Sequence, residues 1–151
     1  MKGEENGMAG NVLVVHGGGP TAVINASLYG VIMEAKESGV IDHVYGAIGG
    51  SEAVLKEQFL DLMKYPQEKL ELLLTTPATA IGSSRYALEE EDYQAMGAIF
   101  KKHDIRYVLL NGGNGTMDTC GKIYRACKDA GVCVVGIPKT IDNDIAITDH
   151  T

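Results

Sequence analysis

Short apolar runs and longer amphipathic segments alternate along this chain. The runs at 11–15, 43–48, 106–110 and 132–137 have the length of strands and are rich in β-branched residues. Each run is almost continuously apolar, which is typical of strands in a parallel sheet that is covered on both faces. The pattern therefore predicts four strands that are buried inside the molecule.

Apolar residues recur at helical spacing between these runs. We expect helices over 21–38, 89–103 and 116–130, with Gly39 and Gly131 as natural ends of the first and third. The second begins with an acidic turn, which suits the positive end of a helix dipole. The residues expected on the apolar sides are Val23, Leu28, Val31, Ile32 and Ala35 in the first helix, Tyr93, Met96, Ile99 and Phe100 in the second, and Met117, Cys120, Ile123, Tyr124 and Cys127 in the third.

Strand and helix follow one another throughout, and 51–76 reads as one or two further helices. This alternation predicts an α/β fold: a doubly wound, mainly parallel sheet with helices on both faces, as in Rossmann-like proteins. We expect a flexible, polar, glycine-rich tail over 1–10 and one domain over 11–151. Ligands of such folds bind beyond the carboxyl ends of the strands, so the junctions from strand to helix are the places to look for function.

Charge and composition exclude several classes of partner. The formal net charge of −7 argues against nucleic acid or an anionic membrane, because both attract basic surfaces. No apolar run approaches the roughly 20 residues that span a bilayer. The three cysteines form no CxxC pair, and we expect buried or half-buried reduced thiols in a cytoplasmic protein.

Two junctions are rich in glycine. Both HGGGPT at 16–21 and NGGNGT at 111–116 follow a predicted strand and precede a predicted helix. Glycines let backbone N–H groups approach a ligand, and a helix N-terminus adds partial positive charge, so the pair predicts a joint phosphate cradle. Neither has the Walker A spacing. A plain tight turn is the alternative for the first junction.

A third junction, PKTIDND at 138–144, places carboxylates beside a cation. Asp142 and Asp144 would point the same way in an extended segment. Beside phosphate, such a pair can serve as a general base and a magnesium ligand, and Lys139 can balance the charge of a transferring phosphoryl group. An Asx-rich solvated turn is the alternative. Arg85, after a Gly-Ser-Ser loop, can clamp phosphate oxygens or pair with the acidic helix start at Glu89 or Glu90.

Taken together, GGGPTAVIN, GSSRY, GGNGT and PKTIDNDIAITDHT, in this order and spacing, resemble the phosphofructokinase family over 11–151. The resemblance implies transfer of a phosphoryl group to the 1-hydroxyl of fructose 6-phosphate, with ATP or pyrophosphate as donor and Mg²⁺ as cofactor. It implies that Asp142 is the general base, that Thr140 contacts the sugar phosphate or the transferring group, and that Asp144 contacts substrate or magnesium. Arg85 would stabilise the transferring phosphoryl group. The donor and its metal would be held by Gly18, Gly19, Tyr86, Gly113, Asn114, Gly115 and Thr116.

Two departures from the family pattern bear on the donor and the metal. The family loop usually reads GGD, and Asn114 replaces that aspartate, so metal binding is expected to be weaker or to rest on Asp144. Pyrophosphate users typically carry an aspartate where this chain has Gly115, and that carboxylate would repel the α-phosphate of ATP. Lys139 resembles the pyrophosphate branch. We expect ATP as donor, with pyrophosphate as the alternative.

Members of the resembled family continue for roughly 150 residues or more beyond the end of this match, about one further domain. We therefore expect a donor-side portion that has little activity alone, within a parent enzyme of glycolysis that forms homo-oligomers. Two other classes stay open. A lipid-kinase-like or NAD-kinase-like protein would explain the second glycine loop but not PKTIDND, and a non-catalytic phosphate-binding regulatory module would explain Asn114.

Overall fold

The computed structural model describes residues 9–139. Its centre is a five-stranded sheet with the order β3-β2-β1-β4-β5. Strands β2, β1, β4 and β5 are parallel to their neighbours, whereas β3 is antiparallel to β2. The mainly parallel α/β sheet predicted from the alternation is confirmed. The strands are β1 Gly10–His16, β2 Ile41–Ala47, β3 Phe59–Asp61, β4 Ile105–Gly112 and β5 Cys133–Pro138.

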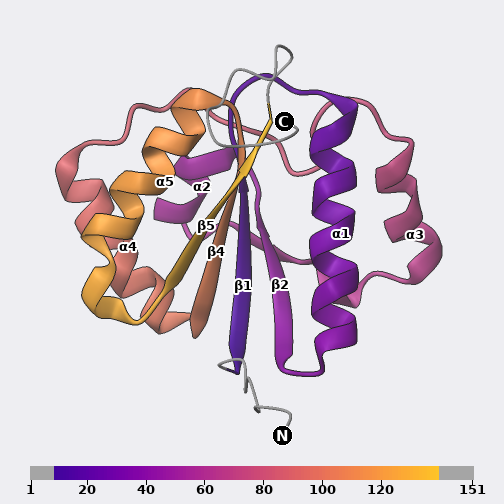
Figure 1. Ribbon diagram of the computed structural model, residues 1–151, viewed down its shortest axis with the longest axis horizontal. Coiled ribbons are helices and arrows are strands. Elements are labelled where there is room, and N and C mark those ends of the chain that lie inside the picture. Colours follow the sequence, from indigo (N-terminus) through magenta and orange to yellow (C-terminus); the bar gives the residue numbers. More distant parts are fainter. Residues whose placement is uncertain (1–8, 140–151) are drawn as a thin grey trace, which may run out of the picture.

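Helices cover the sheet on both sides. Figure 1 shows α1 and α3 on one side and α2, α4 and α5 on the other. The three helices predicted from spacing are confirmed, with ends that differ by a few residues. The helices are α1 Ala22–Ser38, α2 Gly50–Leu55, α3 Gln67–Glu71, α4 Glu90–Lys102 and α5 Asn114–Ala126, with 3-10 turns at Leu62–Lys64, Leu72–Leu74 and Lys128–Ala130.

Alternate residues of the strands build two apolar cores, because successive side chains of a strand point to opposite faces. On one face Leu13 packs with Phe100 of α4 in a fully buried cluster. On the other face Val14 packs with Leu28 and Ile32 of α1. The near-continuous apolar runs of the sequence reflect this burial on both faces. Within the described residues, no helix is long and apolar enough to cross a bilayer.

The region 51–76 differs from its prediction. It contains helices α2 and α3, but a short strand, β3, lies between them and pairs with the edge of β2. Asp61 at the end of β3 accepts a hydrogen bond from the amide of Met63 and lies 2.9 Å from His43 Nδ1 on β2. A three-residue strand fixed by such tertiary contacts has too few residues to show a period in the sequence.

Three expectations about burial are wrong. Val23 and Tyr124 are 53% and 54% exposed, although both were expected on buried helix faces. Val23 lies in the first turn of α1, and Tyr124 lies one residue, or about 100° of rotation, from the buried Ile123. Cys133, expected to be buried or half-buried, is an exposed thiol on β5.

The sheet brings the carboxyl ends of its strands to one edge. His16 at the end of β1 is opposite Asn111 of β4, and Gly112 of β4 is opposite Pro138 of β5. The two glycine junctions and Lys139, far apart in sequence, therefore meet in space. These residues are among the candidate binding residues predicted from the sequence.

Candidate functional site

A hollow of about 210 Å³ lies at the carboxyl ends of β1 and β4. Both glycine junctions contribute to its lining. No acidic side chain is among its described lining residues. The lining consists of Val15, His16, Gly17, Gly18, Ser51, Ser84, Tyr86, Leu110, Gly113, Gly115, Thr116 and Thr119.

The two glycine loops approach each other too closely for side chains. A Cβ atom on either Gly17 or Gly112 would lie 2.3 Å from Thr116 Oγ1. Gly18 has a φ of 71°, a left-handed conformation that glycine adopts without strain. The loops therefore present backbone rather than side chains to the hollow, and the close approach explains why the sequence needs glycine there.

Two helices, α1 and α5, follow the glycine loops directly and begin without a capping side chain, and the start of α5 lines the hollow. Neither Thr21 before α1 nor Gly113 before α5 makes a side-chain cap hydrogen bond, and neither helix has an acidic residue in its first turn. Helix α4 is different: Glu89 and Asp92 close a capping box, and three acids fill its first turn. A helix start without a capping side chain can bind an anion through its first amides, which the helix dipole also favours.

Lys139 links the end of β5 to both glycine loops. Its Nζ donates a hydrogen bond to the carbonyl oxygen of Gly19, and its amide donates to the carbonyl oxygen of Gly112 at 2.8 Å. The ammonium group therefore lies beside the first glycine loop. This cation adds to the positive potential of the helix starts.

The segment 76–86, which precedes α4, lines one side of the hollow through Ser84 and Tyr86 and is held by buried polar groups. His16 Nδ1 lies 2.7 Å from Thr79 Oγ1. Asn25 of α1 is fully buried, donates to Thr76 O at 2.9 Å and accepts from the amide of Ala80 at 2.8 Å. Burial lowers the pKa of His16 from 6.5 to about 4, so its ring is neutral at pH 7.

The same segment carries Ser84 and Tyr86 into the lining. The amide of Tyr86 donates to Ser84 Oγ at 2.9 Å. The neighbouring carboxylate of Asp92 raises the pKa of the Tyr86 hydroxyl. A Cβ on Gly50, the first residue of α2, would lie 2.6 Å from the amide nitrogen of Ser84, so a third glycine junction supports this segment.

Comparison with known proteins shows the family of this chain. The sequence profile of the phosphofructokinase family matches residues 11–151. The chain belongs to the phosphofructokinase family. It is 40% identical over 144 residues to the pyrophosphate--fructose 6-phosphate 1-phosphotransferase of Rhodospirillum rubrum, covering 94% of this chain and 36% of that protein. It is 30% identical to the ATP-dependent 6-phosphofructokinase of Aliivibrio fischeri, covering 95% of this chain and 43% of that protein.

A solved phosphofructokinase has the same fold. The pyrophosphate-dependent phosphofructokinase of Nitrosospira multiformis superposes with a TM-score of 0.86 at 38% identity, covering 93% of this chain and 36% of that chain. The present chain thus spans little more than a third of that phosphofructokinase. The resemblance inferred from four motifs is confirmed.

The structure brings together most of the cradle predicted from the glycine junctions. Gly18, Gly113, Gly115 and Thr116 all line the hollow, as does Tyr86. Gly19 and Asn114 lie in the same two loops but outside the lining of the hollow, and Lys139 reaches Gly19. The predicted roles of Thr140, Asp142 and Asp144 concern residues outside the described part of the chain.

Arg85 does not line the hollow. It is exposed and lies between two lining residues, Ser84 and Tyr86. Among the described residues it forms no ion pair with Glu89 or Glu90, so that alternative is not supported. Glu89 instead caps α4.

Sequence reasoning did not assign four lining residues with polar side chains and one supporting glycine to the site. His16, Ser51, Ser84 and Thr119 all line the hollow, and Gly50 supports it. The pair Gly49-Gly50 follows a predicted strand, as the other two junctions do, and could have indicated a third loop at this edge. Thr119 lies one turn into a helix, where nothing in the sequence separates it from an ordinary surface threonine.

Magnesium requires oxygen ligands, and the side chains among the described lining residues supply only neutral ones. The hydroxyls of Thr116 and Thr119 line it, and the amide of Asn114 lies at the start of α5. The described residues contain no group of three or more His, Cys, Asp or Glu arranged to hold a metal. Such a site fits Mg²⁺ that is bound largely through phosphate oxygens and water.

Proposed function

We propose that the protein to which this chain belongs transfers a phosphoryl group to the 1-hydroxyl of fructose 6-phosphate. One observation carries the proposal: the two glycine loops and the uncapped start of α5 line one hollow that has no acidic residue in its described lining. Lys139 contacts the first of these loops at Gly19. This arrangement binds the phosphates of a donor. The names of the relatives from Rhodospirillum rubrum and Aliivibrio fischeri support fructose 6-phosphate as acceptor.

The donor is proposed from two observations that favour different molecules. Relatives named as pyrophosphate-dependent reach 40% identity, whereas an ATP-dependent relative reaches 30%, which favours pyrophosphate. A Cβ on Gly115 would meet no atom within 4 Å, so the space expected for an ATP α-phosphate is open, which supports ATP. Pyrophosphate and ATP are therefore the two candidate donors, and one assay distinguishes them.

Residues of this chain would divide the work as follows. The amides of the two loops and the Lys139 ammonium would neutralise the donor phosphates and the charge that develops during transfer. Asp142, by the family resemblance, would accept the proton of the sugar hydroxyl, and Thr140 and Arg85 would contact the transferring group. Mg²⁺, held by donor phosphates with Asn114 and Asp144, would offset their negative charge.

The donor assay uses a full-length chimera in which this chain replaces the matched 36% of the Nitrosospira multiformis enzyme. It offers pyrophosphate or ATP, with fructose 6-phosphate and magnesium, and measures fructose 1,6-bisphosphate. We expect turnover with one donor and little or none from the 151-residue chain alone. Robust turnover by the short chain would contradict a donor-side role, and no turnover with either donor would contradict the proposed reaction.

The base role is tested separately in the same chimera with Asp142→Asn, which keeps the shape of the side chain. We expect turnover to fall by about 100-fold or more, since a general base contributes at least that factor. Binding of pyrophosphate or ATP, measured by calorimetry, should persist because the donor cradle is intact. Unchanged turnover would remove Asp142 from the mechanism, and retained binding without activity in the parent itself would favour the regulatory module.

A further inference from the structure

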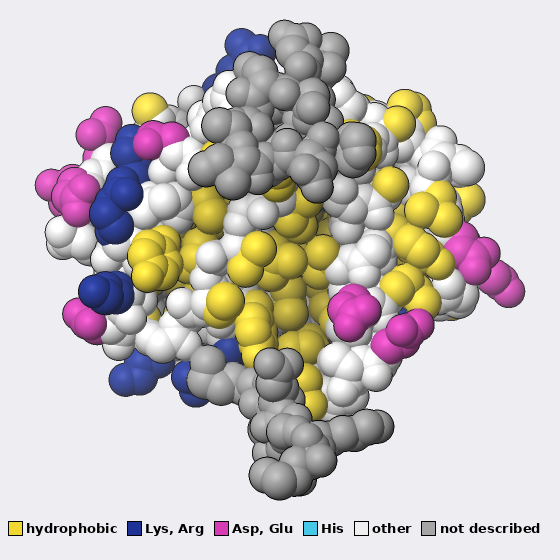
Figure 2. Space-filling model, viewed as in Figure 1, with side chains coloured by type: hydrophobic (Ala, Val, Ile, Leu, Met, Phe, Trp, Pro, Cys, Tyr) yellow, Lys and Arg dark blue, Asp and Glu magenta, His cyan; other side chains and the backbone are white. Residues whose placement is uncertain are grey.

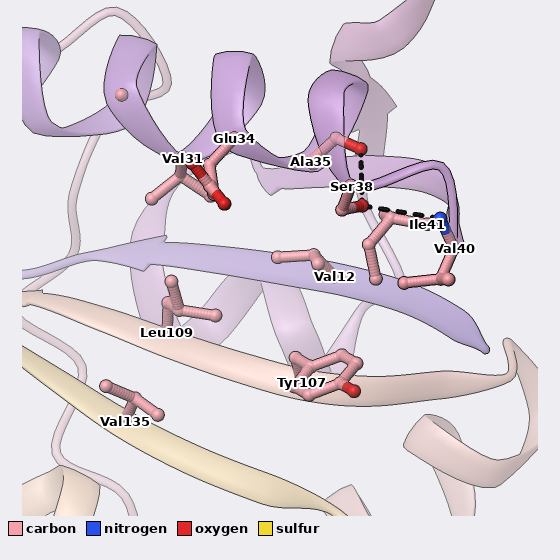
Figure 3. Close-up of a pocket in the computed structure, with 11 residues that line it drawn as sticks. Val12, Val31, Glu34, Ala35, Ser38, Val40, Ile41, Tyr107, Leu109 and Val135 are labelled. Carbon is pink, nitrogen blue, oxygen red and sulfur yellow. Dashed lines mark hydrogen bonds between the residues drawn. The ribbon is translucent and has the colours of Figure 1, made fainter. Parts of the chain in front are cut away.

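Buried polar side chains gather at one end of the side of the sheet that carries α1. His16, Asn25 and Asn111 are each at most 1% exposed. Further along, this side is apolar: a hollow of about 470 Å³ runs between α1 and the strands, and Figure 3 shows Val31 of α1 above Leu109 of β4. Figure 2 shows this region as a band of hydrophobic side chains across the middle of the molecule. The three buried polar residues lie instead at the carboxyl edge, next to the hollow of about 210 Å³.

His16 is joined to the segment 76–86 by a hydrogen bond whose direction follows from its partner. The Nδ1 atom of His16 lies 2.7 Å from Thr79 Oγ1. The Thr79 hydroxyl has one proton, which it donates to the carbonyl oxygen of Gly82 at 3.3 Å, so it accepts a hydrogen bond from the ring. The neutral imidazole therefore carries its proton on Nδ1, and Thr79 extends the connection to Gly82.

The start of this segment has a backbone conformation that needs support from its surroundings. Ala78 has a φ of 65°, a left-handed conformation that is unfavourable for a residue with a Cβ atom. Asn25 binds both sides of it: Nδ2 donates to Thr76 O at 2.9 Å, and Oδ1 accepts from the amide of Ala80 at 2.8 Å. Such strain persists where neighbouring groups fix the backbone. Asn25 and His16 are the buried side chains that do so here.

The fixed part of the segment leads directly into the lining of the 210 Å³ hollow. Gly82, which accepts from Thr79, has a φ of 72° and lies two residues before Ser84. Ser84 and Tyr86 both line the hollow, and so does His16 itself. Because so few residues separate Gly82 from Ser84, a displacement at Thr79 would be passed on to the wall of the hollow.

We propose that His16 is a positioning residue for the binding of the phosphoryl donor. By donating a hydrogen bond to Thr79, it holds Ser84 and Tyr86 in the wall of the hollow. His16 directly precedes the first glycine loop, so one side chain fixes the segment relative to backbone that would bind phosphate. Fixing the wall before the ligand arrives favours binding, because less freedom is lost on association. The identity of the ligand rests on the proposed function, whereas the hold of His16 on the segment does not.

The first test needs no ligand and uses the 151-residue chain. Long-range proton–nitrogen NMR spectra at pH 7 distinguish the two neutral forms of an imidazole, and we expect the His16 proton on Nδ1. Thr79→Val keeps the shape of the side chain and removes its hydroxyl. The amide of Ala80 should then exchange with solvent at least about fivefold faster, because the segment opens more often.

Thr75→Val is the matched control for hydrogen exchange. The Thr75 hydroxyl also donates to a backbone carbonyl oxygen, that of Leu72 at 3.4 Å, but Thr75 does not line the hollow. Exchange at Ala80 should be unchanged in this variant. Equal exchange at Ala80 in wild type and Thr79→Val would overturn the proposal. A proton on Nε2 would overturn it as well, because His16 would then not donate to Thr79.

The second test measures pyrophosphate binding to the same chain by calorimetry. His16→Leu removes both ring nitrogens, whereas His16→Asn restores an amide donor near the place of Nδ1. We expect binding to weaken by about fivefold or more in His16→Leu and in Thr79→Val, as for the loss of one hydrogen bond, and to recover largely in His16→Asn. The double variant should bind no more weakly than either single variant, because both remove the same interaction.

Val44→Ala separates positioning from a general loss of stability. Val44 is fully buried in the core and does not line the hollow, so its truncation should lower the thermal midpoint and leave the affinity unchanged. The proposal is overturned if Val44→Ala weakens binding as much as His16→Leu, or if the losses in the double variant add. If wild type binds neither pyrophosphate nor ATP, the proposed function is contradicted, whereas faster exchange at Ala80 in Thr79→Val would still support His16 as the group that positions the segment.

Discussion

The Nζ atom of Lys139 donates a hydrogen bond to the carbonyl oxygen of Gly19, 120 residues earlier in the chain. This contact joins the end of β5 to the first glycine loop, while the Lys139 amide binds Gly112 O of the second. One residue thus connects three strand ends. We propose that this ammonium group interacts with the phosphates of a donor. Its removal should therefore weaken donor binding.

Lys139→Met keeps the length of the side chain and removes its charge. We expect pyrophosphate binding by the 151-residue chain to weaken by about tenfold or more, since charge-assisted hydrogen bonds contribute roughly 1.5–3 kcal/mol. Isothermal calorimetry at fixed ionic strength measures it. Lys128→Met, at an exposed lysine of a 3-10 turn, is the control for net charge. Equal weakening by both would show that overall charge, and not the position of Lys139, governs binding.

Gly112→Ala should disturb the fold of the site. The added Cβ would lie 2.3 Å from Thr116 Oγ1 and 2.7 Å from Gly17 O, so backbone must move. Overpacking of this kind costs about 1–3 kcal/mol, or a fall of several degrees in the thermal midpoint. Gly19→Ala, where the Cβ meets nothing within 4 Å, is the matched control and should change stability little. A tolerated Gly112→Ala would mean that the two loops are not tightly packed.

Gly115→Asp tests the open space beside the second loop. The position has room for a Cβ, so the chain should fold with an unchanged thermal midpoint. The new carboxylate should weaken ATP binding by about tenfold or more through repulsion at close range. Gly115→Asn, of the same size but neutral, separates charge from bulk. If ATP binding is the same in wild type and Gly115→Asp, the α-phosphate does not occupy this space.

His16 predicts a loss of stability in mild acid. Its folded-state pKa of about 4 lies below the unfolded value of 6.5, so the unfolded chain binds the proton more readily. The stabilisation from this buried neutral ring is complete above pH 6.5 and is lost as pH falls towards 4. The difference corresponds to about 3 kcal/mol in the free energy of unfolding.

The check is urea unfolding at several pH values between 7 and 4 for wild type and His16→Gln. Glutamine does not titrate in this range, so the variant should lose less stability on acidification than wild type. His43→Gln, at a partly exposed ring on β2, should retain the His16 component of the pH dependence. Parallel profiles for wild type and His16→Gln would show that His16 is not held neutral.

Much of the site could be predicted because its signals are local. Gly17 and Gly112 are required by close approach of backbone, and the glycine runs that contain them stand out between a strand and a helix. The contribution of the 76–86 segment could not be predicted. It depends on Asn25 and His16, whose partners lie 51 to 63 residues away, and an isolated asparagine or histidine carries no sign of such a contact.

By itself the sequence determined the alternation of strands and helices, the family, and the three junctions that bear chemistry, because hydrophobic period and glycine punctuation are properties of neighbouring residues. Only the tertiary structure decided that Lys139 reaches Gly19, that Tyr86 faces the hollow while Arg85 does not, and that β4 and β5 present an apolar face to solvent. Those facts arise from strand order and from side-chain direction within the packed sheet, which depend on contacts between distant residues.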